Sequence, residues 1–302
     1  MTPLTLALDW TPNINHIGFF IAQEQGFYRE QELDVTLLDP GTDDYATTPA
    51  KKVELGQADL ALCPTESVIS YRTKDRPFPL IAIAALLQDD LSAIAVRADS
   101  PITGPRDLDG KTYASYAARY EDEIVREMVR HDGGSATIQF ERPSKLGIWD
   151  TLRNGTYDAT WVFTNWEGVE AEEAGVDLRY FRLKDYDIPY SYSPVIAAGA
   201  NAVEQHADTY RRFLTATKQG YMFTQENPGE AVGILRRFLP ARDHDFNLKK
   251  ALKATSPFIG DPNTWGRMDT DTVNRFLDWL RAHGLESRQL AAGDIFTNAL
   301  IP

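Results

Sequence analysis

Four side chains that suit ligand binding lie together near the start of the chain. Asp9, Trp10, Asn13 and His16 surround Pro12, where an apolar strand pattern stops and an amphipathic helix pattern begins. An indole beside a carboxylate and an amide, at the carboxyl end of a strand, suits a flat polar ligand that is both stacked and hydrogen-bonded. Trp10 also fits a core residue at the sheet end, and Asn13 and His16 also fit caps of the following helix.

Two further helix starts follow predicted strands. Pro64 stands at the first position of a predicted helix and has Glu66 close behind it, so that this start faces the same crevice as the first cluster. Ser115 and Tyr116 precede a helix expected over 118–130. Since the amides of a helix start can hold a formyl, carboxylate or phosphate oxygen, we expect Glu66, Ser115 and Tyr116 in the ligand site.

Strand-like and helix-like periods alternate along the chain, which predicts an α/β fold with parallel strands covered by helices. The first set of predicted elements comprises strands near 4–8, 33–38, 58–62 and 80–87, with helices near 16–25, 45–55 and after residue 64. The second set comprises strands near 93–96, 111–115, 137–140 and 159–163, with helices near 118–130, 144–154 and 165–174. After an apolar strand near 193–198, helices are expected over 207–225, 228–238, 246–254 and 271–283.

This order predicts one lobe interrupted by another. Lobe 1 is expected to comprise residues 1–88 and 194–302, and lobe 2 residues 89–193, with the chain crossing twice between them. Two crossings form a hinge, and a hinge gives a closable cleft for the ligand. Tyr190, beside the second crossing, is expected to close over a planar ligand or to pack between the lobes. The alternative architecture is a single doubly wound sheet.

Composition excludes several classes of function. The 302 residues include 44 acidic and 31 basic side chains, a net charge of −13, which disfavours nucleic acid and anionic membranes as partners. Cys63 is the only cysteine, and the five histidines are widely spread, so we expect neither a disulfide nor a metal site. No apolar run is long enough for stable membrane insertion, and no signal peptide is apparent. The expected location is cytoplasmic, or periplasmic or extracellular if a leader has been removed.

Several segments resemble one family. "LDWTPNINHIGFFIAQEQGFYREQELDVTLLDP", "GQADLALCPTESVISY", "DLDGKTYASY", "GTYDATWVFTNWEGVEAEEAG" and "DYDIPY" are similar to the thiamine pyrimidine precursor family. This family includes formylaminopyrimidine-binding proteins of ABC importers and a fungal pyrimidine synthase that uses pyridoxal phosphate. The resemblance implies a two-lobed fold of the type 2 periplasmic-binding-protein kind, with a hinge and an interlobe cleft.

The resemblance also implies roles for particular residues. Trp10 stands where a tryptophan of the relatives stacks on the heterocycle. Asn165 and Glu167 stand where an asparagine and a glutamate follow a strand of the second lobe, and that glutamate pairs with the amino-pyrimidine edge. A carboxylate can accept from an exocyclic amine and a protonated ring nitrogen side by side. Glu167 also fits a first-turn acid that complements the helix dipole. Trp10 and Glu167 are expected on opposite walls of one cavity.

The same resemblance provides a test for catalysis. Cys63 stands where the synthase has its cofactor lysine, Ser67 stands where it has its histidine, and its cysteine-rich run is absent. A Schiff base needs an amine, and an iron–thiolate site needs thiols. We therefore expect no cofactor and no enzyme activity. Cys63 near helix-start amides keeps open a minor role as a nucleophile with a lowered pKa.

The sequence is thus interpreted as a solute-binding protein for a flat heterocycle, most simply an aminopyrimidine precursor of thiamine. An ABC permease is the expected partner if the protein is exported, and a cytoplasmic form would carry or sense the precursor. The alternative is a divergent enzyme that acts on a pyrimidine or pyridoxal derivative. The same scaffold also serves sulfonates, nitrate and riboflavin.

Overall fold

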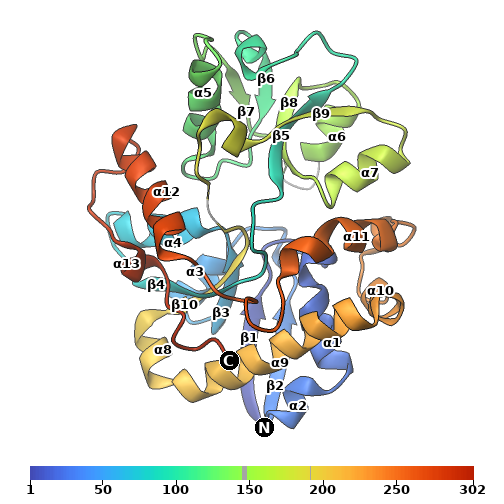
Figure 1. Cartoon of the computed structure of the whole chain (residues 1–302), viewed down its shortest axis with the longest axis vertical. Helices are drawn as coiled ribbons and strands as arrows, with labels where there is room; N and C mark the ends of the chain where they lie inside the picture. Colours follow the sequence, from blue (N-terminus) through green and yellow to red (C-terminus); the bar gives the residue numbers. More distant parts are fainter. Residues whose placement is uncertain (145–147, 191) are drawn as a thin grey trace. The chain divides into compact units, whose positions relative to one another are not determined.

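The computed structural model describes residues 1–144, 148–190 and 192–302, and these fall into two compact units (Figure 1). The first unit comprises Met1–Asp90, Ser191–Asn274 and Arg288–Pro302, and the second comprises Leu91–Tyr190 and Arg275–Ser287. Each unit has its own five-stranded sheet. The α/β class is therefore confirmed, and the alternative of a single continuous sheet is wrong.

The first sheet has the strand order β2-β1-β3-β10-β4. Its strands are β1 (Thr2–Ala7), β2 (Leu33–Leu38), β3 (Leu60–Cys63), β4 (Leu80–Ala85) and β10 (Val195–Gly199). β1 runs parallel to β2 and β3, whereas β10 runs antiparallel to β3 and β4. β3 and β10 are buried along their whole length, as expected for short apolar strands at the centre of a covered sheet.

Two helices of the first unit pack unusually closely. α1 (Ile17–Glu24) lies beside α9 (Ala207–Glu226), as Figure 1 shows. A Cβ atom at Gly220 would lie only 2.0 Å from the carbonyl oxygen of Gly18, so these two positions accept no side chain without moving the helices apart. Because α1 follows the first candidate cluster directly, this contact fixes where that cluster lies.

Shorter elements complete the first unit. They are η1 (Ile14–His16), α2 (Phe27–Glu30), η2 (Pro40–Asp43), α3 (Pro49–Glu54), α4 (Thr65–Thr73), α8 (Ala200–Gln205), α10 (Pro228–Arg236), η6 (Ala241–Asp243), α11 (Leu248–Ile259) and α13 (Ala292–Ile295). A further helix, α12 (Thr270–Ala282), begins in the first unit and continues into the second.

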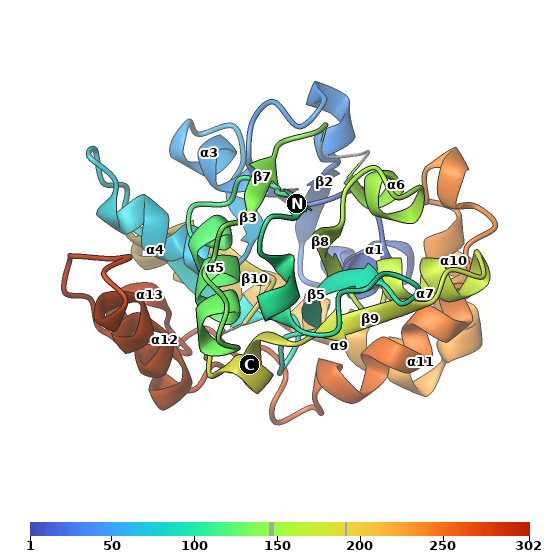
Figure 2. The same cartoon turned by 90° about the horizontal axis from the view of Figure 1, so that it is seen from above.

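The second sheet has the strand order β7-β6-β8-β5-β9. Its strands are β5 (Ser92–Arg97), β6 (Thr112–Ala114), β7 (Gln139–Glu141), β8 (Ala159–Phe163) and β9 (Leu178–Phe181). The helical elements are η3 (Pro105–Leu108), α5 (Glu121–His131), α6 (Ile148–Arg153), α7 (Glu167–Glu173) and η5 (Leu183–Tyr186). Figure 2 shows α5 on one side of this sheet and α6 and α7 on the other, where Trp149 and Leu152 pack against β5 and β8.

Some predicted boundaries differ from the structure. The helix expected over 45–55 begins only at Pro49, because Tyr45 has a left-handed backbone angle and Thr48 is the extended cap whose side chain accepts from the Lys51 amide. The helix expected from 118 begins at Glu121, and part of the one expected over 144–154 lies on residues 145–147, outside the described residues. The chain passes between the units four times instead of twice, because Arg275–Ser287, assigned to lobe 1 from the sequence, groups with the second unit.

No helix in the described ranges has both the length and the apolar character that a membrane span requires.

Candidate ligand-binding site

The first candidate cluster lies at one edge of the first sheet. β1 and β3 are parallel neighbours, so the residues that follow Ala7 and those that follow Cys63 emerge at the same edge. β10 is antiparallel, and its first residue, Val195, pairs with Cys63 and with Ala85 at the end of β4. The predicted residues of this unit therefore follow the carboxyl ends of adjacent strands, the usual place for ligands in open α/β sheets.

Asp9 and His16 form a hydrogen-bonded pair at this edge. His16 Nε2 lies 2.7 Å from Asp9 Oδ1, and His16 is fully buried while the Asp9 side chain is 27 % exposed. The second ring nitrogen, His16 Nδ1, is buried and has no hydrogen-bond partner in the described part of the chain. An unsatisfied buried ring nitrogen is a ready partner for a ligand or a water molecule.

The two predicted capping residues behave differently. Asn13 caps η1: its Oδ1 accepts from the amide of Asn15 at 2.9 Å, and its Nδ2 donates to the carbonyl of Thr11 at 3.1 Å. His16 precedes α1 but makes no side-chain capping hydrogen bond, because its ring turns to Asp9. The capping role is therefore confirmed for Asn13 and wrong for His16.

Trp10 packs against an aromatic residue that sequence reasoning missed. Its ring centroid lies 4.9 Å from that of Tyr45, with the planes tilted by 57°. The Tyr45 hydroxyl accepts from the amide of Thr11 at 3.2 Å, and Tyr45 and Asp44 both have left-handed backbone angles. Such angles are uncommon outside glycine and often mark functional segments. Nothing local in the sequence points to this contact, because 34 residues separate the partners of that hydrogen bond.

Glu66 lies in the first turn of α4 and is buried. Pro64 is the extended cap of this helix and does not occupy its first turn, and the carbonyl of Tyr192 accepts from the Thr65 amide at 3.2 Å. Contrary to the sequence expectation, the Thr65 amide at this helix start is therefore already used.

Cys63 is buried at the end of β3. Burial raises the pKa of its thiol well above the usual range, and the negative charges of Asp9 and Glu66 raise it further. The hypothesis of a nucleophile with a lowered pKa is therefore wrong, because the amides of the helix start do not offset desolvation.

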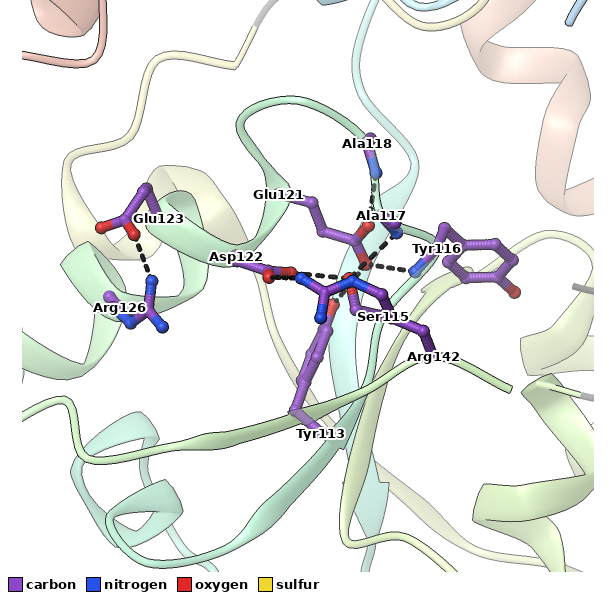
Figure 3. Close-up of polar contacts among 10 residues, drawn as sticks. All are labelled: Tyr113, Ser115, Tyr116, Ala117, Ala118, Glu121, Asp122, Glu123, Arg126 and Arg142. Carbon is purple, nitrogen blue, oxygen red and sulfur yellow. Dashed lines mark hydrogen bonds and ion pairs between the residues drawn. The ribbon is translucent and has the colours of Figure 1, made fainter. Parts of the chain in front are cut away.

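The second candidate cluster lies at the corresponding edge of the second sheet. β6 and β8 are parallel neighbours, so Ser115 and Tyr116 emerge beside the residues that follow Phe163. Ser115 Oγ donates to Asp122 at 2.6 Å and accepts from the amide of Ala117 at 3.0 Å (Figure 3). The loop between β6 and α5 is thus held by a side chain of α5.

Glu121 is a second residue that sequence reasoning missed. It is buried, and its carboxylate accepts from the amides of Tyr116 at 3.1 Å and Ala118 at 3.2 Å and from the hydroxyl of Tyr113 at 3.1 Å (Figure 3). Burial outweighs these hydrogen bonds and raises the pKa of Glu121 to about 6. In the sequence it is one of three consecutive acids at a helix start, a pattern typical of solvated residues that complement the helix dipole.

Asn165 and Glu167 follow β8 as expected. Asn165 is buried, and Glu167 is the first residue of α7. Glu167 Oε2 accepts from the amide of Phe163 at 2.8 Å. This hydrogen bond holds the carboxylate at the start of α7.

Tyr190 belongs to the second unit and lies in an aromatic cluster. Its ring centroid is 5.3 Å from that of Trp161 on β8 and 5.4 Å from that of Phe276 on α12, and both contacts are edge-on. Both partners belong to the same unit as Tyr190, so these contacts hold its ring to that unit.

A cavity of about 410 Å³ in the second unit lies apart from the predicted residues. Its lining comes from α5, from η5 and the turn after it, and from the end of α12 and the residue that follows it, and consists of Glu127, Arg130, His131, Tyr186, Asp187, Ile188, Trp279 and His283. In the described ranges no three histidine, cysteine or acidic side chains gather in a way that would hold a metal ion.

Two relatives are similar to this chain over nearly its whole length. A formylaminopyrimidine-binding protein of Halalkalibacterium halodurans is 27 % identical over 299 residues, which cover 96 % of this chain and 88 % of the relative. A 4-amino-5-hydroxymethyl-2-methylpyrimidine phosphate synthase of Saccharomyces cerevisiae is 30 % identical over 299 residues, which cover 94 % of this chain and 82 % of the relative.

Solved structures share the fold. A Candida albicans protein described as having the generic periplasmic binding protein fold matches with a TM-score of 0.72 and 16 % identity over 99 % of this chain and 97 % of that one. The periplasmic aliphatic sulphonate-binding protein of Escherichia coli matches with a TM-score of 0.71 and 14 % identity over 97 % and 91 %. The expected periplasmic-binding-protein-like fold is confirmed.

A model of the family described as NMT1/THI5 like matches residues 13–231. Since this match covers well over half of the chain, the chain belongs to the NMT1/THI5-like family.

Proposed function

We propose that this protein binds a small flat heterocycle, an aminopyrimidine related to the thiamine pyrimidine, without converting it. The observation that carries the proposal is the relation to the formylaminopyrimidine-binding protein, which extends over 96 % of the chain and includes both sheets. The fold of solute-binding proteins supports it, since that scaffold commonly places ligands at strand ends.

The strand-end residues of each unit are the proposed ligand contacts. In the first unit these are Trp10, Asn13, His16 and Glu66, and in the second unit Ser115, Tyr116, Asn165, Glu167 and Tyr190. Trp10 would supply a stacking face and Glu167 a charged acceptor for ring and exocyclic nitrogens. His16 Nδ1 adds a hydrogen-bonding group that is unused by the described residues. Tyr45, packed on Trp10, joins the proposed contacts.

Import is the proposed physiological setting. The fold shared with a periplasmic sulphonate-binding protein supports a location outside the cytoplasm and delivery to an ABC permease. The comparisons lend no support to the cytoplasmic expectation.

An enzyme remains the second candidate, because several relatives at up to 30 % identity are named pyrimidine phosphate synthases. The buried thiol of Cys63, with its raised pKa, does not suit nucleophilic chemistry. Two measurements with a formylaminopyrimidine separate the two candidates. Mass spectrometry after incubation shows whether the compound is changed, and thermal melting of the protein with and without the compound shows whether it binds. A binding protein gains melting temperature and returns the compound unchanged. Turnover, or the absence of a thermal shift with any aminopyrimidine, would overturn the proposal.

Two variants test the proposed contacts. Trp10→Ala and Glu167→Gln should each weaken aminopyrimidine binding by about tenfold or more, the first through lost stacking and the second through a lost charge. Glu167→Gln keeps an oxygen for the amide of Phe163, so the start of α7 is preserved. Trp10→Phe, which retains an aromatic face, and Glu173→Gln, at an exposed position of the same helix, are the matched controls. Wild-type affinity in both test variants would exclude the proposed contacts.

A further inference from the structure

Lys52 is a buried cation in the first unit. It lies on α3, and only 9 % of its side chain is exposed. Its ammonium Nζ lies 2.8 Å from Oδ2 of Asp43, the last residue of η2. Lysine is seldom buried unless its charge is paired, so this ion pair holds the end of η2 against α3.

Two strained residues follow Asp43 directly. Asp44 and Tyr45 have φ angles of 52° and 60°, in the left-handed region that residues with a side chain seldom adopt. Such residues persist only where the surrounding structure holds the backbone. Within this turn the Tyr45 amide donates to the carbonyl of Pro40 at 3.0 Å, and just before it stands the ion pair of Asp43 with Lys52. The ion pair thus anchors the turn to a helix that packs on β3.

The turn places Tyr45 against the residues that follow β1. Its ring centroid lies 4.9 Å from that of Trp10, and its hydroxyl accepts from the Thr11 amide at 3.2 Å. The indole of Trp10 is the stacking face of the proposed site, and a tyrosine ring tilted against it limits the directions in which the indole can turn. The position of the indole therefore depends on where the turn holds Tyr45.

We infer that Lys52 is a positioning residue for the ligand site. Its ion pair with Asp43 fixes the turn, and the turn holds Tyr45 where its ring supports the stacking face of Trp10. This inference rests on the proposed function, in which Trp10 stacks on a flat heterocycle. It makes the affinity for that heterocycle depend on a buried lysine that acts through other residues.

The test compares Lys52→Met with Lys51→Met as full chains. Methionine keeps an unbranched apolar side chain in the buried position, and the Asp43 side chain is 31 % exposed and can turn to water, so we expect Lys52→Met to fold. Lys51, the preceding residue of α3, forms an ion pair of the same length with Glu54, but its side chain is 44 % exposed. Lys51→Met is therefore the matched control. Tyr45→Leu removes the ring through which Lys52 acts.

The first measurement needs no ligand. The indole N–H resonance of Trp10 in an NMR spectrum, assigned by its loss in Trp10→Phe, reports on the tyrosine ring beside it. Tyr45→Leu and Lys52→Met should shift this resonance in the same direction, whereas Lys51→Met should leave it at the wild-type position. Asp43→Asn, which removes the charge from the other side of the pair, should shift it in that direction too. A resonance unchanged in Tyr45→Leu or Lys52→Met, or shifted equally by Lys51→Met, would overturn the inference.

The second measurement is the dissociation constant for a formylaminopyrimidine. Lys52→Met should raise it about fivefold, as expected when an aromatic pair is lost, and Lys51→Met should leave it within about twofold of wild type. In the Tyr45→Leu background Lys52→Met should change it by less than about twofold, because the ring through which Lys52 acts is already gone. An equal effect of Lys52→Met in both backgrounds would mean that the ion pair serves only the fold, contrary to the inference. Lack of binding by wild type would instead count against the proposed function, while the Trp10 resonance still decides the role of Lys52.

Discussion

The two strand-end clusters present their polar groups in different ways. In the first unit, Asp9 binds His16 and Trp10 packs on Tyr45, so two of the proposed ligand residues are each held by another side chain. In the second unit, a buried carboxylate holds backbone, because Glu121 accepts the amides of the loop after β6. His16 in the first cluster thus depends on how tightly its helix packs, whereas the loop of the second cluster depends on a charge. Variants that disturb packing or charge separately test this distinction.

The largest effect is expected where helix packing supports the first cluster. Gly220→Ala places a Cβ atom 2.0 Å from the carbonyl oxygen of Gly18, so α9 and α1 must separate. We expect the free energy of unfolding, measured in urea, to fall by about 3 kcal/mol, as for other overpacked interiors. The same helix carries His16 at its start, so affinity for the ligand should fall as well.

Gly233→Ala is the control for this variant. Gly233 lies inside α10 of the same unit, and an added Cβ meets no atom within 4 Å. Alanine should there raise stability by about 0.5–1 kcal/mol, because it favours the helix. If both alanine variants changed stability equally, close contact between α1 and α9 would not be what holds the first cluster in place.

The next effect is a pH dependence of stability that arises at the second cluster. The pKa of Glu121 is raised from 4.5 to about 6 by folding, so the folded chain binds this proton more tightly than the unfolded chain. Stability from this group is therefore fully present below about pH 4.5 and is lost as the pH rises to about 6. At about 1.4 kcal/mol per pKa unit the loss amounts to about 2 kcal/mol.

Glu121→Gln removes this dependence of the unfolding free energy on pH. Subtracting its unfolding free energy from that of wild type cancels the other titrating groups and should leave a decline of about 2 kcal/mol between about pH 4.5 and about pH 7. Glu123→Gln, the same substitution two residues later at a partly exposed side chain, is the matched control. A flat line for Glu121→Gln would mean that ionisation at the second cluster carries no stability cost.

The contrast between the clusters also explains what the sequence can predict. Apolar runs of period two indicate strands, and the amphipathic runs between them indicate helices. Because both patterns depend on local sequence, they predict both sheets and the strand ends at Trp10 and Ser115. The capping role of Asn13 follows too, because a cap bonds to residues two or three positions away.

Contacts between distant or identical-looking residues do not follow from local sequence. Tyr45 reaches Trp10 only through the fold, since a left-handed turn brings it there. Glu121 is buried whereas Glu123, two residues later, is partly exposed, and this difference arises from the path of the loop. The grouping of Arg275–Ser287 with the second unit likewise depends on tertiary packing of α12.

The smallest effect is expected at the Asp9–His16 pair. Asp9→Ala removes the partner of His16 Nε2, and His16 Nδ1 already has none in the described part of the chain. Asp9 is 27 % exposed, however, so water can replace the lost carboxylate. We therefore expect a loss of about 1 kcal/mol in unfolding free energy, at the low end for a buried group left without its partner. Asp34→Ala, at an exposed position of β2, should stay within about 0.5 kcal/mol of wild type. If the Asp9 variant matched the Asp34 variant, side-chain pairing would not stabilise the first cluster, and helix packing alone would distinguish it from the second.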